Sequence, residues 1–254
     1  MLAPRCAACA AILDRPLDGP VCGSCWSRVR PLVPPLCRTC GDPLPSWRIL
    51  SVALEQCPRC RRGANLLSAA RAAGEYEGTL RDILHAFKYD GRRALARPLG
   101  VMMRTAGADL LRDAHCVVPV PLHSWRRLRR GFNQAGELAV HLGVPVVHAL
   151  WRTRATAPQT GLHAAARRRN VRDAFGVSPL LSHGARERWL ANRIVVLVDD
   201  VRTTGATLNA CAAVLDEAGA REVRALTVAR AAPPEPRQLI RASPLVIRSG
   251  RASR

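Results

Sequence analysis

The sequence predicts an α/β fold in which helices cover both faces of a parallel sheet, preceded by a small cysteine-rich, zinc-ribbon-like module. Two observations support this prediction. Eight of the ten cysteines form four C-x-x-C pairs near the N-terminus. From about residue 70, short apolar runs alternate with helical patterns, and such alternation of strands and helices is typical of a parallel sheet.

Length and composition narrow the possible classes of protein. At 254 residues the chain is long enough for one full domain and a small one. Its hydrophobic fraction of 48% excludes wholesale disorder. No stretch approaches the roughly 20 uncharged apolar residues that span a bilayer, and Cys6 follows the N-terminus too closely for a signal peptide. We therefore expect a cytoplasmic protein without a membrane span.

The four cysteine pairs indicate metal rather than disulfides, because the chain shows no export signal and a reducing cytosol disfavours disulfides. A C-x-x-C turn can direct two thiolates at one ion, and two such turns complete a tetrahedral zinc site. Such sites are closed by sulfur, so we expect two structural zinc ions. Sequential pairing of the four motifs is simplest, and interleaved pairing is also compatible with the sequence. The predicted ligands are Cys6, Cys9, Cys22, Cys25, Cys37, Cys40, Cys57 and Cys60.

Apolar spacing predicts the elements of the α/β part. Leu80, Ile83, Leu84 and Phe87 lie on one face of a helix expected within residues 74–91. In chain order, the patterns that follow predict a helix over 93–111, a strand over 116–122, a helix over 133–142, a strand over 144–150, a strand over 193–200, a helix over 205–218 and a strand over 221–230.

Composition and apolar periodicity predict that the chain has three parts. The first is rich in Cys, Pro and Arg and has little apolar periodicity, so metal rather than an apolar core must hold it together. We expect a double zinc-ribbon-like domain over 1–66, the α/β domain over 67–230 and a basic disordered tail over 231–254.

The segment VVLVDDVRTTGATL, residues 195–208, predicts a phosphate-binding site. A continuous apolar run, typical of a strand covered on both faces, ends in Asp199 and Asp200, and a helix follows. The N-terminus of a helix offers unpaired backbone N–H groups and a positive dipole end, which suits a monophosphate. Gly205 lets the backbone approach closely, and the carboxylates can accept hydrogen bonds from ribose hydroxyls. Ligands of open α/β sheets usually bind beyond the carboxyl ends of the strands.

This segment resembles the ribose-phosphate signature of type I phosphoribosyltransferases, and four stretches together resemble the ComF family. The stretches are HAFKYDGRRALA (85–96), VVPVPLHSWRRLRRGFNQA (117–135), PQTGLHAAARRRNVRDAF (158–175) and VVLVDDVRTTGAT (195–207). The resemblance extends over nearly the whole chain to about residue 230. It implies a type I phosphoribosyltransferase fold behind a zinc-ribbon-like module, and an association with DNA uptake in competent bacteria.

The resemblance also implies a site for phosphoribosyl pyrophosphate with Mg²⁺. Asp199 and Asp200 would hold the ribose hydroxyls, and with Lys88 they are the expected catalytic residues. The residues implied at the 5′-phosphate are Thr203, Thr204, Gly205, Ala206 and Thr207, and Val201 and Arg202 are implied as further ligand-binding residues. Those implied at the pyrophosphate are Pro119, Val120, Pro121, Leu122 and His123, with Arg130, Asn133 and Gln134 beside them. Those implied in the family's mobile flap are Gln159, Leu162, Arg169 and Asn170.

Two basic residues stand out from the others. Lys88 is the single lysine among 39 basic residues, and a position that keeps a compact ammonium group is a candidate for contact with a pyrophosphate. Arg202 departs from the family pattern, since such signatures usually carry an apolar residue there. Its side chain would either add positive charge to the site or point into solvent.

Two hypotheses about function follow. In the first, the protein is a phosphoribosyltransferase, and therefore a glycosyltransferase, with an acceptor that the sequence does not identify. In the second, it is a non-catalytic protein of natural transformation that binds single-stranded DNA, uses the site as a ligand sensor and meets other DNA-uptake proteins. The net charge of +20 fits polyanionic partners, although an overall bias toward Arg also explains it. Two Arg runs would track a DNA backbone if they share a face, and the alternative for each run is a solvated helix face. The runs are Arg126, Arg127, Arg129, Arg130, then Arg167, Arg168, Arg169, Arg172.

Overall fold

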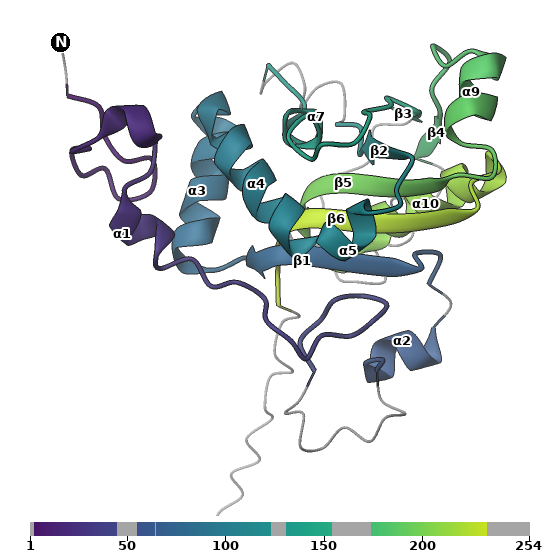
Figure 1. Cartoon of the computed structure of the whole chain (residues 1–254), viewed down its shortest axis with the longest axis horizontal. Coiled ribbons are helices and arrows are strands. Elements are labelled where there is room, and N and C mark those ends of the chain that lie inside the picture. Colours follow the sequence, from purple (N-terminus) through teal and green to yellow (C-terminus); the bar gives the residue numbers. More distant parts are fainter. Residues whose placement is uncertain (1–2, 45–54, 64, 123–130, 154–173, 233–254) are drawn as a thin grey trace, which may run out of the picture.

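The computed structural model describes residues 3–44, 55–63, 65–122, 131–153 and 174–232, and shows a sheet with helices on both of its faces (Figure 1). Within these residues, no helix combines the length and the apolar character needed to cross a membrane. The elements in chain order are η1 (Pro16–Asp18), α1 (Gly23–Trp26), α2 (Pro58–Arg62), β1 (Ala69–Glu75), α3 (Gly78–Tyr89), η3 (Arg93–Leu95), α4 (Ala96–Ala106), α5 (Ala108–Leu111), β2 (Cys116–Pro119), α7 (Gln134–Ala139), β3 (Leu150–Arg152), β4 (Phe175–Val177), α9 (His183–Trp189), β5 (Ile194–Arg202), α10 (Ala206–Glu217) and β6 (Glu222–Arg230).

Four parallel strands form the main sheet, in the order β1-β6-β5-β2. β5 pairs with β6 from Ile194 opposite Glu222 to Arg202 opposite Arg230. Residues 194–198 of β5 are all buried, as expected of a strand whose two faces are covered. The predicted parallel sheet is therefore confirmed, and its carboxyl edge is where the chain passes from β5 into α10.

Each face of the sheet carries its own apolar cluster. Leu84 of α3 and Leu99 of α4 pack with Val196 of β5 on one face. Leu208 of α10 packs with Val195 on the other. Successive strand residues point to opposite faces, so β5 supplies side chains to both clusters. Because burial of one such aliphatic side chain contributes about 2 kcal/mol, the two clusters hold the strand end that precedes α10 firmly in place.

The helix expected over 93–111 is interrupted near its end. α4 stops at Ala106 and α5 starts at Ala108, with Gly107 between them. A Cβ atom at Gly107 would lie 2.6 Å from the side chain of Leu226 in β6. The glycine therefore permits the close approach of helix and sheet at the point where the helix breaks.

The strand expected over 144–150 forms only a single parallel bridge, between Val146 and Val117 of β2. Pro145 has no N–H group with which to extend the ladder. The N–H of Ala149 donates to the carbonyl of Val147 at 2.9 Å, which turns the chain away. The regular strand of this region is instead β3, which pairs antiparallel with β4 in a separate two-stranded sheet.

The apolar pattern does not predict β1. Its residues AARAAGE are mostly alanine, which favours helices and is depleted in strands. The strand pairs along its length with β6, from Ala69 opposite Arg224 to Glu75 opposite Arg230. Tertiary pairing therefore overrides local preference here.

The segment between the second and third cysteine pairs joins the cysteine-rich part to the sheet. Pro31 forms an antiparallel bridge with Gly74 of β1, and the N–H of Glu75 donates to the carbonyl of Arg30 at 3.0 Å. A Cβ atom at Gly74 would lie 2.8 Å from that carbonyl oxygen, so glycine permits the approach. In Figure 1, α1 lies beside α3 while α2 lies beneath β1, so the first cysteine-rich loop lies by a helix and the second by a strand of the sheet. The predicted boundary at residue 66 stays a prediction.

Candidate functional site

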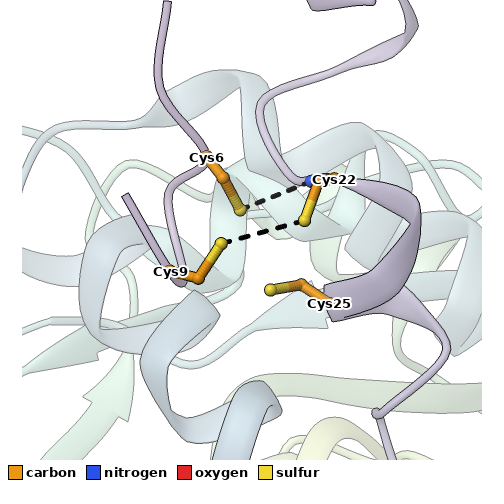
Figure 2. A group of neighbouring side chains, drawn as sticks. All are labelled: Cys6, Cys9, Cys22 and Cys25. Atoms are coloured by element: carbon orange, nitrogen blue, oxygen red, sulfur yellow. Dashed lines mark hydrogen bonds between the residues drawn. The ribbon is translucent and has the colours of Figure 1, made fainter. Parts of the chain in front are cut away.

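The eight predicted ligand cysteines form two clusters, and the sequential pairing is the one that the structure shows. The first cluster contains Cys6, Cys9, Cys22 and Cys25, whose side chains point toward a common centre in Figure 2. The second contains Cys37, Cys40, Cys57 and Cys60. In each cluster all sulfur atoms lie within 4.8 Å of one another.

These sulfur positions fit tetrahedral zinc. A Zn–S bond of about 2.3 Å places neighbouring sulfur atoms roughly 3.8 Å apart. The Sγ atoms of Cys9 and Cys22 are 3.9 Å apart, and those of Cys40 and Cys57 are 3.6 Å apart. The donor set therefore matches two structural zinc sites, in agreement with the sequence.

Backbone groups prepare the first cluster for a cation. Burial raises the pKa of the Cys6 thiol, but N–H groups, led by that of Cys22, outweigh burial and lower it to about 6. Burial raises the pKa of the Cys25 thiol to about 12. Four crowded thiols cannot all ionise by themselves, and a divalent cation that replaces their protons relieves this conflict.

The predicted phosphate-binding segment forms a turn between β5 and α10. Gly205 adopts a left-handed conformation, with φ of 78°, directly before the first helical residue. The side chain of Asn209 donates to the Gly205 carbonyl at 3.0 Å, and Thr204 Oγ1 accepts from the N–H of Ala206 at 3.4 Å. This turn presents the N-terminus of a helix of 12 residues to the carboxyl edge of the sheet, where an anion is favoured. We call residues 203–207 the cradle.

Two carboxylates and one ammonium group lie beside the cradle. Lys88 Nζ of α3 is 2.9 Å from Asp200 Oδ1, and the two side chains are 12% and 14% exposed. Burial lowers the pKa of Lys88, but the charge of Asp200 outweighs burial and raises it above its ordinary value. The ring of Tyr76 lies below the same ammonium group, 5.8 Å from Nζ to the ring centroid. Asp199 Oδ1 accepts from the N–H of Asp200 at 2.9 Å.

A cavity of about 330 Å³ brings most of the predicted site together. Its wall contains parts of α3, β5 and α10, the loop after β2 and the start of α7. Asn133 donates to the carbonyl of Val120 at 3.2 Å and so fastens that loop to α7. The predicted residues that line it are Lys88, Val120, Pro121, Leu122, Asn133, Gln134, Asp199, Asp200, Val201, Arg202, Thr203, Thr204, Gly205, Ala206 and Thr207.

The other predicted residues do not line this cavity. Pro119 lines a neighbouring cavity of about 340 Å³, which shares Pro121 and Leu122 with the first. Six predicted site residues, and all eight arginines of the two Arg runs, lie outside the part of the chain that the structure describes. The six are His123, Arg130, Gln159, Leu162, Arg169 and Asn170.

The sequence allows two alternatives for the Arg202 side chain, added positive charge at the site or a position in solvent. The second alternative is wrong. The residue is 4% exposed, and its guanidinium group donates to Asp42 Oδ1. Asp42 comes from the loop of the second cysteine cluster, and it also accepts from Arg230 at 2.9 Å. Burial raises the pKa of the Asp42 carboxyl. The nearby arginines, Arg202 above all, outweigh burial and hold the pKa below its ordinary value. The apolar residue expected at position 202 is thus replaced by one half of a buried ion pair.

Five residues of the cavity wall were not predicted: Tyr76, Tyr89, Ala135, Arg152 and Leu208. Tyr89 directly follows Lys88 and Tyr76 lies just before α3, so the segment around Lys88 could have indicated both tyrosines. Arg152 lies on β3, and its guanidinium carbon is 5.2 Å from the ring centroid of Phe175. Because β3 is not a predicted strand, no pattern in the sequence places this arginine at the cavity.

Known domain profiles and relatives match both parts of the chain. A profile of the double zinc ribbon domain matches residues 1–61, and a profile of the phosphoribosyl transferase domain matches residues 128–249. Competence protein F of Haemophilus influenzae is 30% identical over 237 aligned positions, and the match covers 89% of this chain and 97% of that protein. DNA utilization protein YhgH of Escherichia coli is 31% identical over 224 residues, or 83% and 90%. A solved structure of the allosteric regulatory enzyme of purine biosynthesis is 22% identical with a TM-score of 0.36, covering 56% of this chain and 29% of that one.

Proposed function

The chain belongs to the ComF family, the family of competence protein F, and from this premise we propose that it binds phosphoribosyl pyrophosphate with Mg²⁺ and transfers the phosphoribosyl group to an acceptor. One observation carries the proposal. A helix N-terminus, two adjacent carboxylates and a buried ammonium group face one cavity at the carboxyl edge of the sheet. These are the groups that a phosphate, a ribose diol and a pyrophosphate require.

Each group has a separate role in the proposed reaction. The cradle binds the 5′-phosphate through backbone N–H groups and threonine hydroxyls. Asp199 and Asp200 accept hydrogen bonds from the ribose hydroxyls and orient the sugar. Lys88 holds positive charge on the same side, where it favours the departing pyrophosphate; a well-placed group of this kind contributes about 2–4 kcal/mol.

The carboxylates also fit the metal that accompanies the ligand. Mg²⁺ prefers oxygen ligands and commonly binds through one or two carboxylates together with substrate phosphates. Asp199 and Asp200 are the carboxylates that line the cavity among the residues that the structure describes. When bound, the metal supplies further positive charge to the leaving group.

The proposed setting is DNA uptake in the cytoplasm. The names of both relatives refer to competence or to DNA utilization, and the net charge of +20 suits a nucleic-acid partner. Single-stranded DNA and other DNA-uptake proteins are therefore proposed partners. All eight arginines of the two Arg runs, which would contact DNA, lie outside the described residues. A binding assay with single-stranded DNA at increasing salt concentration tests this partner. An affinity that does not change with salt contradicts the proposal.

Two matched glycine variants test ligand binding at the cradle. Gly205 and Gly143 have nearly equal φ angles, 78° and 76°, so alanine at either position costs about 1–2 kcal/mol of stability. A Cβ atom at Gly205 meets only Asn209, at 3.6 Å, and one at Gly143 meets nothing within 4 Å. We expect Gly205→Ala to weaken binding of phosphoribosyl pyrophosphate about tenfold, or about 1.4 kcal/mol, because the methyl group enters the cradle.

Isothermal titration calorimetry with Mg²⁺ measures this effect. Gly143→Ala should lose similar stability and keep the affinity of the wild type, since Gly143 lies away from the cavity wall. Equal affinities of the two variants would show that the ligand does not use the cradle.

A further inference from the structure

The second cysteine cluster sends one carboxylate into the α/β part. Asp42 follows Cys40 by two residues, and its carbonyl accepts from the N–H of Cys37 at 2.8 Å. A bridge between Leu36 and Pro43 closes the same hairpin. The conformation of the cysteine loop therefore fixes the position of the Asp42 side chain, which is 13% exposed.

Asp42 holds the ends of the two central strands. Its Oδ1 atom accepts from Arg202, the last residue of β5, and from Arg230, the last residue of β6. These two arginines lie opposite each other in the parallel register. Arg59, from the helix that carries Cys60, lies 3.8 Å from Oδ2 of the same carboxylate. One carboxylate thus gathers three cations at the carboxyl edge of the sheet.

This ion cluster adjoins the cavity on two sides. Arg202 directly precedes the cradle, so whatever fixes Arg202 also fixes the start of that turn. On the other side, the carbonyl of Arg230 accepts from the N–H of Tyr76 at 2.8 Å. Tyr76 lines the cavity beneath Lys88. The cluster is therefore linked to both the phosphate side and the ammonium side of the proposed site.

The first cysteine cluster has no equivalent link. It packs through Ala7, Ala8 and Trp26 against the apolar cluster of α3 and α4. Among the residues that the structure describes, no ion pair connects residues 5–28 to β5 or β6. The two metal sites therefore stand in different relations to the cavity.

We propose that Asp42 is a positioning residue for the cradle, and that through it metal binding at the second cysteine cluster sets the affinity of the site for its phosphate ligand. The part of this inference that concerns affinity rests on the proposed function. The part that concerns the conformation of the cradle does not. A metal-free second cluster would release the hairpin, then Asp42, and then the strand ends that Asp42 holds.

Asp42→Asn removes the charge with little change of shape, and Asp113→Asn is the matched control. Asp113 pairs with Arg224 of β6 near the opposite end of the strand, so its loss also breaks a carboxylate–arginine cluster on the same strand, but away from the cavity. Both variants should retain two zinc ions by elemental analysis. Hydrogen–deuterium exchange without ligand should be faster at residues 202–207 in Asp42→Asn, by about tenfold, and unchanged in Asp113→Asn.

Ligand affinity gives the second measurement. Titration with phosphoribosyl pyrophosphate and Mg²⁺ should show about tenfold weaker binding for Asp42→Asn than for Asp113→Asn, within the range of coupling through residues that do not touch a ligand. If Asp42→Asn does not fold, Arg202→Met removes the cradle end of the link and leaves Asp42 paired with Arg230. That variant should show the same faster exchange.

Unchanged exchange at residues 202–207 in the zinc-loaded variants overturns the inference. Failure of the wild type to bind phosphoribosyl pyrophosphate instead overturns the proposed function, and the exchange result still decides whether Asp42 positions the cradle. Removal of zinc from the wild type by a chelator should reproduce the faster exchange, and unchanged exchange after chelation contradicts the role of the metal.

Discussion

Cys40→Ser is expected to remove one zinc ion and to destabilise the protein by several kcal/mol. Cys40 is 2% exposed, and its Sγ atom contacts that of Cys57. A hydroxyl group in its place leaves the cation with three thiolates, and the binding free energy of a structural zinc ion, about 10–16 kcal/mol in isolated fingers, contributes directly to folding. Within the described residues the second cluster packs with only one other hydrophobic residue, Leu44, so little apolar packing compensates for the loss.

Zinc content by elemental analysis, together with thermal unfolding, checks this result. Cys116→Ala serves as the control, because Cys116 is buried in β2 away from both clusters and donates only to the carbonyl of Trp189. That variant should keep two zinc ions per chain and lose about 1 kcal/mol. Two zinc ions in Cys40→Ser, or fewer than about one in the wild type, would show that the clusters are not zinc sites.

Asp200→Asn is expected to weaken binding of phosphoribosyl pyrophosphate by about 100-fold. The substitution removes a charged acceptor for a ribose hydroxyl, and a hydrogen bond to a charged group is worth about 1.5–3 kcal/mol. It also leaves the Lys88 ammonium, 12% exposed, without its carboxylate at 2.9 Å. Loss of one partner from a buried pair costs about 3 kcal/mol of stability, so the variant should also unfold at a lower temperature.

Calorimetry and thermal unfolding measure the two effects of Asp200→Asn. Asp216→Asn is the control, since Asp216 is exposed near the C-terminal end of α10, away from the cradle. This substitution should change neither the affinity nor the unfolding temperature. Wild-type affinity in Asp200→Asn would exclude a role for this carboxylate in ligand binding.

The loss of stability in Asp200→Asn should not vary across neutral pH. Burial lowers the pKa of Lys88, and Asp200 more than offsets this, so the pKa lies above its ordinary value of 10.5. When folding raises the pKa of a group, that group stabilises the folded state fully at pH values below its pKa in the unfolded chain. This stabilisation is lost as the pH rises through its pKa in the folded protein. Above neutral pH, the difference in stability between wild type and variant should therefore narrow only in strongly alkaline solution.

The sequence predicts the residues of the candidate site better than it predicts the strands and long-range contacts around them. The run that ends in Asp199 and Asp200 combines a fully buried strand, two acids and a glycine before a helix, and local chemistry explains each of these residues. Lys88 is predicted because it is the single lysine of the chain, and in the structure its ammonium group forms an ion pair with Asp200. The eight cysteines were predictable because their spacing alone defines a metal site.

Long-range contacts account for the features that the sequence does not predict. β1 is made mostly of alanine and becomes a strand only because β6 pairs with it. Asp42 and Arg202 are 160 residues apart, and nothing near either residue indicates the other. β3 and β4 are three residues each and pair across a long intervening segment, so neither has the length or the alternation that identifies a strand.

Two-dimensional NMR of the uniformly ¹⁵N-labelled, zinc-loaded protein tests the central proposal most directly. Phosphoribosyl pyrophosphate with Mg²⁺ is added stepwise, and the backbone amide signals are followed. We expect saturable shifts concentrated at residues 203–207, because these N–H groups would bind the 5′-phosphate. Saturation without shifts at these residues, or no shifts at all in the folded protein, would contradict the assignment of this turn as a phosphate-binding site.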